Sequence, residues 1–79
     1  MSSRVELSFA RLHGPEHVPE IGNMPAALEV GAPGTIKIDS LTLVDSQFVE
    51  VRATNKTSAT SIMFLVPVTN FRVMQPKEQ

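Results

Sequence analysis

Histidine and glutamate residues that could bind a metal ion lie close together in one stretch of the chain. Imidazole nitrogens and carboxylate oxygens are zinc ligands, and two histidines four residues apart lie on one face of a helix. Gly14 and Pro15 fall inside this spacing, and both disfavour a helix. We therefore expect a solvated acidic loop with no bound metal; metal binding and pH-sensitive docking are the alternatives. The four residues concerned are His13, Glu16, His17 and Glu20.

Residues for covalent catalysis are not grouped in any known pattern. The chain has no cysteine, and none of its serines lies in the Gly-x-Ser-x-Gly turn that presents a nucleophile. Both histidines lie in a stretch rich in glycine and proline, which is a poor place to hold a general base beside a nucleophile. Residues 31–34 contain two glycines but lack the lysine and the following helix of a phosphate-binding loop. We predict a protein that is not an enzyme and uses no cofactor or small-molecule substrate.

The length and charge of the chain limit the remaining functions. Its 79 residues form at most one domain, 1–79, and domains this small often need a disulfide, a metal or a partner chain for stability. The absence of cysteine excludes disulfides and thiolate metal sites, so we expect self-association or docking onto a larger assembly. Seven basic and eight acidic residues are nearly balanced, unlike the basic excess of strong nucleic-acid binders.

The sequence also predicts where the protein works. Its first residues lack the apolar core of a signal peptide. No apolar run approaches the roughly 18 residues that span a bilayer. We expect a cytoplasmic protein that does not associate with membranes and is not secreted through a signal peptide.

Short stretches of alternating polar and apolar residues predict β-strands on both sides of a central segment, 13–34. Near the N-terminus, Val5, Leu7 and Phe9 alternate with polar neighbours, which is typical of a half-buried strand. The apolar run 62–66 is typical of a strand covered on both faces. These patterns predict an all-β fold of five or six antiparallel strands, curled into a small SH3-like or OB-like barrel. The expected strands are residues 4–12, 35–43, 49–53, 62–66 and 71–73, followed by a flexible tail, 75–79.

The alternation in the second of these strands changes phase. Ile36 and Ile38 hold one phase, whereas Leu41 and Leu43 hold the other. A shift of one residue reverses which side chains face the core. A β-bulge or sharp bend near Asp39 is the simplest cause, and bent strands of this kind are how small barrels close.

The central segment, 13–34, holds every glycine of the chain and four of its six prolines. Proline fixes a φ angle and removes a backbone donor, so we predict an extended loop or arm with at most one short element. Residues 27–30 favour a short edge strand that turns through Gly31 and Gly34 into the next strand; a helical turn capped by Asn23 is the alternative. We expect the arm to order against a protein partner, because prolines lower the entropy lost on docking.

The residues expected to contact that partner are apolar. Phe48 falls out of phase with Val49 and Val51, so its ring should be exposed. The apolar side chains of the second sheet face exceed what so small a domain can bury, and such surface marks a protein contact; cover by the central segment is the alternative. The expected second-face residues are Leu41, Val44, Phe48, Met63, Leu65 and Met74, and the expected contact residues are Met24, Leu28, Val30 and Phe48.

Binding of single-stranded nucleic acid by the small barrel is the main alternative function. Such sites interleave basic residues with aromatic stacking platforms. Three basic residues have apolar neighbours along their strands and could share one face, whereas the aromatic residues are four phenylalanines alone. The candidate residues are Lys37, Arg52, Arg72 and Phe48.

Residues 64–74, Phe-Leu-Val-Pro-Val-Thr-Asn-Phe-Arg-Val-Met, combine an apolar strand, a Pro-x-x-Asn turn and a final short strand. This stretch resembles the ending of small β-barrel proteins encoded by bacteriophages. The resemblance implies an accessory or virion-associated protein, located in the host cytoplasm or the virion, without catalytic residues. The combined expectation is a non-enzymatic protein-interaction module that self-associates or docks onto a larger assembly.

Overall fold

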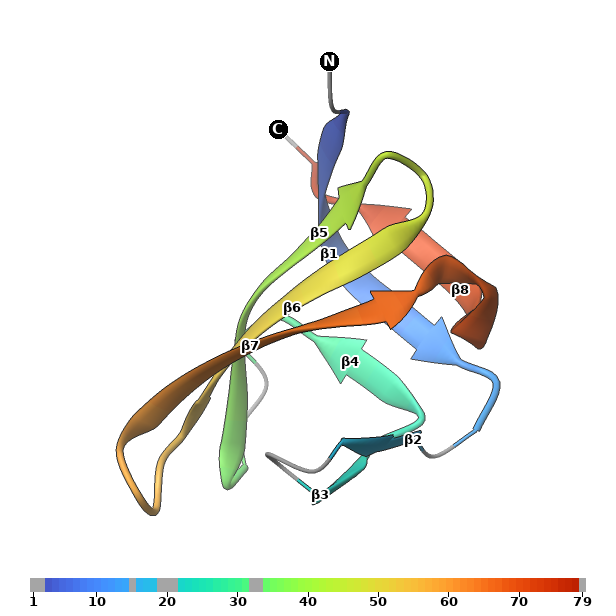
Figure 1. Ribbon diagram of the computed structural model, residues 1–79. Helices are drawn as coiled ribbons and strands as arrows, with labels where there is room; N and C mark the ends of the chain where they lie inside the picture. The colour runs from blue at the N-terminus through green and yellow to red at the C-terminus, as the bar shows by residue number, and fades with distance from the viewer. Residues whose placement is uncertain (1–2, 15, 19–21, 32–33, 79) are drawn as a thin grey trace.

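The computed structural model describes residues 3–14, 16–18, 22–31 and 34–78, and within them β-strands dominate (Figure 1). The helical structure in these ranges is a single 3-10 turn, η1. None of the described segments is a helix with the length and hydropathy needed to cross a membrane. The elements are β1 (Arg4–Leu12), β2 (Glu16–Val18), β3 (Gly22–Met24), β4 (Ala27–Glu29), β5 (Ile36–Val44), β6 (Phe48–Asn55), β7 (Thr60–Pro67), η1 (Val68–Asn70) and β8 (Phe71–Pro76).

Six of the strands form one antiparallel sheet, which confirms the all-β class expected from the sequence. The order of its strands is β4-β1-β5-β6-β7, and β8 pairs with β1. Leu7 of β1 has partners on both β5 and β8, and Phe9 has partners on both β4 and β8. Because a strand has two edges, β4 and β5 share one edge of β1, and β8 takes the other.

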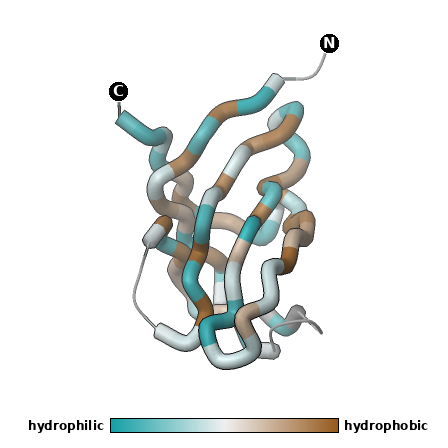
Figure 2. The backbone as a smooth tube through the Cα atoms, turned by 90° about the vertical axis from the view of Figure 1, so that its left-hand side faces the viewer, coloured by the Kyte–Doolittle hydropathy of each residue, from teal (hydrophilic) through white to brown (hydrophobic). Residues whose placement is uncertain are grey.

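The alternation of side chains along these strands determines the core. In β6, Val49 and Val51 are buried, whereas Phe48 and Arg52 are exposed. The same change between polar and apolar positions is visible along the strands in Figure 2. The inward-facing residues come from β3 and from every strand of the large sheet, and they pack into one cluster. Its members are Leu7, Ala10, Leu12, Met24, Leu28, Ile38, Leu41, Val49, Val51, Ala53, Val66 and Phe71.

β5 contains the bulge expected from its change of phase. Its register against β6 shifts between Ile38 and Ser40, so Asp39 is the extra residue. Ile38 and Leu41, which lie on either side of the bulge, both face the core. The bulge therefore lets one strand present apolar residues of both phases to the same core.

The described part of segment 13–34 is not the extended arm expected from its glycines and prolines. β4 pairs with β1, β2 pairs with β3, and the residues Met24 and Leu28 are only 2% and 1% exposed. The strand expected at 27–30 is present as β4. It does not form the expected hairpin with β5. Instead, β4 pairs with β1, and the bridge from Val30 to Ile38 of β5 is parallel. Burial of apolar side chains outweighs the local effect of the prolines, since a domain this small needs them to complete its core.

The end of the chain has the strand-turn-strand order expected for residues 64–74. β7 ends at Pro67, η1 contains Asn70, and β8 begins at Phe71. β8 extends to Pro76, so part of the tail expected at 75–79 is a strand. Among the described residues, β7 pairs only with β6, and β8 pairs only with β1. The SH3-like or OB-like barrel therefore stays a prediction, and β7 has a free edge.

Candidate protein-contact surface

One face of the sheet points away from the core and carries the side chains that could contact a partner. Antiparallel pairing determines which side chains are neighbours on this face. Leu65 of β7 lies opposite Glu50 of β6, and Met63 lies opposite Arg52. Phe48 lies two residues before Glu50 on β6 and therefore on the same face. We call Phe48, Met63 and Leu65 the outer apolar patch.

The outer apolar patch is open to solvent. The exposed fractions of Phe48, Met63 and Leu65 are 39%, 54% and 55%, so the central segment does not cover them. Burial of apolar area is worth about 25 cal/mol per Å². These side chains therefore gain the rest of that stabilisation, about half of it for Met63 and Leu65, only when another molecule covers them. Their expected exposure on the second face of the sheet is confirmed.

The prediction that Leu41 and Met74 lie on the second face of the sheet is wrong. Leu41 lies in the core, because the bulge at Asp39 absorbs the change of phase, and Met74 packs against the core cluster. Val44 does lie on the outer face, opposite Phe48, and is partly buried there.

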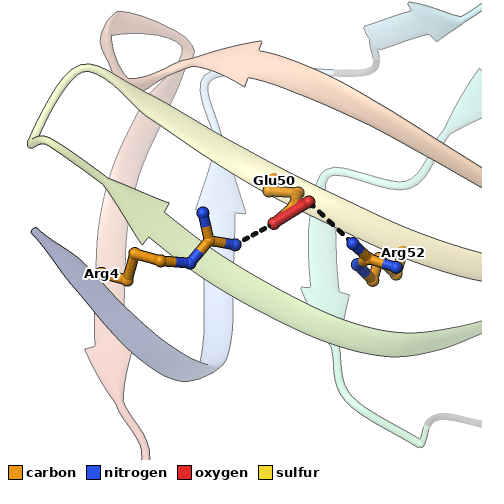
Figure 3. A network of polar contacts seen from close by, with 3 residues as sticks. All are labelled: Arg4, Glu50 and Arg52. Carbon is orange, nitrogen blue, oxygen red and sulfur yellow. Dashed lines mark hydrogen bonds and ion pairs between the residues drawn. The ribbon is translucent and has the colours of Figure 1, made fainter. Parts of the chain in front are cut away.

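Among the described residues, Glu50 is the only polar or charged residue that the fold buries. Its Oε2 accepts a hydrogen bond from the Arg4 guanidinium, and its Oε1 accepts one from Arg52 Nη2 at 3.2 Å (Figure 3). The Glu50 side chain is 10% exposed, against 53% for Arg4 and 59% for Arg52. Because β5 lies between β1 and β6, the Arg4 contact braces the outer face across three strands.

The hydrogen bond from Arg4 is the main cause that holds the pKa of Glu50 below its usual value. The positive charges of both arginines and the Arg52 hydrogen bond act in the same direction, while burial opposes them. Glu50 is therefore ionised at neutral pH, and both its oxygens are occupied. Each of its oxygens accepts a hydrogen bond from one arginine, and the Arg4 bond ties β1 to β6 on the outer face.

The backbone of β7 presents its free edge next to the outer apolar patch. β7 keeps one register against β6 over its whole length. Immediately after β7, the Val68 N–H donates to the Gln47 carbonyl at 2.9 Å, in the same register. Hydrogen-bonded and non-hydrogen-bonded pairs alternate in an antiparallel ladder. Every second residue from Val66 back along β7 therefore turns its N–H and C=O toward β6.

Met63 and Leu65 are the intervening residues, and they direct their backbone groups to the free edge. The same two residues thus combine exposed apolar side chains with unpaired backbone donors and acceptors.

A hollow of about 340 Å³ opens beside Met63. It is lined by Asp39, Arg52, Ala53, Ser61, Ile62 and Met63.

β7 lacks the features that protect sheet edges from pairing, such as charges, bulges and short length. Its eight residues, Thr-Ser-Ile-Met-Phe-Leu-Val-Pro, contain no charge, and the proline is the last of them. By contrast, β8 carries Arg72, and its register shifts twice against β1. β4 has only three residues and ends in Glu29. A long, regular and uncharged edge favours the addition of another strand.

Two of the four contact residues predicted from the sequence are exposed, Val30 and Phe48, each at 39%. The contact role predicted for Met24 and Leu28 is wrong for the folded chain, because both side chains lie in the core. Val30 follows β4 and bridges Ile38 of β5, so β6 separates it from β7. Of the predicted set, Phe48 alone belongs to the outer apolar patch.

The fold does not assemble the residues of the nucleic-acid alternative into one site. Lys37 and Arg52 share a face of adjacent strands, because Lys37 pairs with Thr54, two residues from Arg52. Arg72 lies on β8, which is separated from β6 by β1 and β5. Arg52 is already in an ion pair, and Phe48 is the only phenylalanine that the described structure leaves well exposed.

The histidine and glutamate cluster is described only in part. His13 and His17 are exposed, and His17 Nδ1 lies 3.3 Å from Asn23 Oδ1 across the pair of strands β2 and β3. Within the described ranges, no three histidine, cysteine or carboxylate side chains are placed to hold a metal ion. Glu20 and the side chain of Glu16 lie outside the described residues, so the absence of a metal here stays a prediction.

In comparisons with protein families, curated proteins and solved structures, no significant match to this chain was found. The resemblance of residues 64–74 to bacteriophage proteins stays a prediction. The outer apolar patch and the free edge of β7 are therefore the basis for a functional proposal.

Proposed function

We propose that the protein is a non-enzymatic protein-interaction module that binds its partner through the outer apolar patch and the free edge of β7. One observation carries the proposal: Met63 and Leu65 present exposed apolar side chains and outward-facing backbone groups at the same place. Under the bacteriophage resemblance, the partner belongs to a virion or to a larger assembly in the host cytoplasm.

Strand addition uses both properties of this edge. Hydrogen bonds from Met63 and Leu65 hold an extended partner strand in register, and alternate side chains of that strand cover the outer apolar patch. Glu50 supports the surface from the neighbouring strand, because its contacts with Arg4 and Arg52 keep a carboxylate neutralised directly beside Leu65. The site is therefore ordered before a partner arrives, which lowers the entropy lost on binding.

Selection from a random peptide display library on the immobilised protein tests the proposal. The enriched peptides should be extended and apolar, and Leu65→Lys should weaken their binding roughly tenfold or more, because it places a charge in the contact. Val73→Lys is the matched control, since Val73 is an exposed apolar residue on β8. Peptides that bind the Leu65→Lys variant as tightly as the wild type would contradict the proposed surface, as would a selection that enriches none.

A further inference from the structure

We infer that the strand that occupies the free edge of β7 is β7 of a second copy of this chain, paired antiparallel about a two-fold axis at Phe64. The inference rests on the proposed function, because it names the partner of the same edge. It follows from the backbone directions, the side chains and the charges of β6 and β7.

The backbone directions determine the register of this pairing. Met63 and Leu65 direct their N–H and C=O groups outward, so an added strand must form its hydrogen-bonded pairs with them. An axis at Phe64 places Met63 of each copy opposite Leu65 of the other. The two symmetry-related pairs that result are both hydrogen-bonded pairs. Ser61 then lies opposite Pro67, where the missing proline N–H leaves one hydrogen bond in place of two.

The side chains match in the same register. Met63 and Leu65 of the two copies form a continuous apolar stripe on the outer face, where each is more than half exposed in the single chain. No like charges meet along the edge, because β7 contains no charged residue. The contact is self-complementary, as a two-fold dimer interface requires.

The charges one strand behind the edge favour the antiparallel arrangement. On the outer face, Arg52 lies beside Met63, and Glu50 lies beside Leu65. Each row across the dimer therefore runs Arg52, Met63, Leu65 and Glu50, with opposite charges at its ends. These charges are three strand spacings apart, about 14 Å, so their attraction is weak. A parallel pairing would instead align Arg52 with Arg52. An unrelated apolar peptide would gain neither the self-complementary apolar stripe nor the opposite charges at the ends of each row.

Sedimentation equilibrium of the full chain tests the inference, with Leu65→Lys and Val73→Lys as a matched pair of variants. The wild type and Val73→Lys should dimerise, and Leu65→Lys should raise the dimer dissociation constant roughly tenfold or more. Circular dichroism confirms that each variant is folded. A wild type that is monomeric up to about 100 µM, or a Leu65→Lys variant that dimerises as well as the wild type, would overturn the inference.

The register has its own test, because the chain has no cysteine. Met63→Cys and Leu65→Cys proteins are mixed and oxidised. Directly opposite positions have Cβ atoms about 4.5–5.5 Å apart, and diagonal positions about 7–8 Å. Random pairing of equal amounts of the two variants makes the mixed disulfide equal to the two symmetric products combined. The mixed disulfide between residues 63 and 65 should therefore exceed that combined yield, and a mixed yield no greater than it would overturn the register. If the wild type is monomeric but Leu65→Lys still weakens peptide binding, the self-pairing of β7 is refuted and the proposed function stands. If the wild type is monomeric and Leu65→Lys leaves peptide binding unchanged, the proposed function is refuted as well.

Discussion

Replacing Glu50 with glutamine should destabilise the fold by an amount that depends on pH. The amide keeps the size of the side chain but removes the charge that Arg4 and Arg52 neutralise. Both arginines are about half exposed, so solvent screens each contact, and each is worth roughly 0.5–1 kcal/mol. The expected loss at pH 7 is therefore about 1–2 kcal/mol, or roughly 4–16 °C in Tm for a domain of this size.

The direction of the pH dependence follows from the lowered pKa of Glu50. Its contribution to the free energy of unfolding is fully present above the unfolded-state pKa, near the ordinary value of 4.5. It is lost as the pH falls through the lower folded-state pKa, because the carboxyl is then protonated in both states. The wild type and Glu50→Gln should therefore differ most at neutral pH and converge in acid.

Urea denaturation followed by far-UV circular dichroism measures this difference, since the chain has no tryptophan or tyrosine. Low micromolar protein keeps self-association from adding to the apparent stability. Glu6→Gln is the control, because the Glu6 side chain is 73% exposed and 3.9 Å from Lys77. Equal losses in the two variants, or a Glu50→Gln effect that is the same at every pH, would refute the structural role of Glu50.

Three further predictions test other parts of the account. Leu28→Ala should lower the free energy of unfolding by about 2–4 kcal/mol through a core cavity, and Val30→Ala by under about 0.5 kcal/mol, in urea denaturation; similar losses would argue against the core position of β4. Gly31→Ala should destabilise the fold by about 1 kcal/mol in thermal melts, because an alanine is strained at the Gly31 φ of +77°. No steric clash adds to this cost, since a Cβ at Gly31 meets nothing within 4 Å. Labelled single-stranded DNA and RNA should show no saturable anisotropy change below about 10 µM protein at low salt, whereas tight binding with a steep salt slope would support the nucleic-acid alternative.

Local patterns were sufficient to predict the bulge of β5 and the strands outside segment 13–34, but not β2 and β3 within it. The phase change between Ile38 and Leu41 is visible in the sequence, and the bulge is its direct consequence. The same kind of pattern gave the wrong place for Met24 and Leu28, because prolines interrupt the alternation around them. Burial of these two residues depends on which strands close the core, and this is a property of the whole fold.

The candidate site was predictable only in its apolar half. The exposure of Phe48 follows from its phase against Val49, but the free edge of β7 depends on pairing across the whole sheet. Glu50 was missed because Arg4 is 46 residues away in the sequence and reaches it across β5. The available signal was the alternation of Glu50 and Arg52 on one face of β6, and it does not reveal burial.

Amide hydrogen exchange at single residues of β7, measured by NMR at two protein concentrations, tests the free edge most directly. The Phe64 N–H bonds to β6 and should be protected at both concentrations. The Met63 and Leu65 N–H groups should exchange rapidly in dilute protein and become protected as the concentration rises and a second β7 covers them. Equal protection of Met63, Phe64 and Leu65 in dilute protein would contradict the account, because the edge of β7 would then already be paired within its own chain.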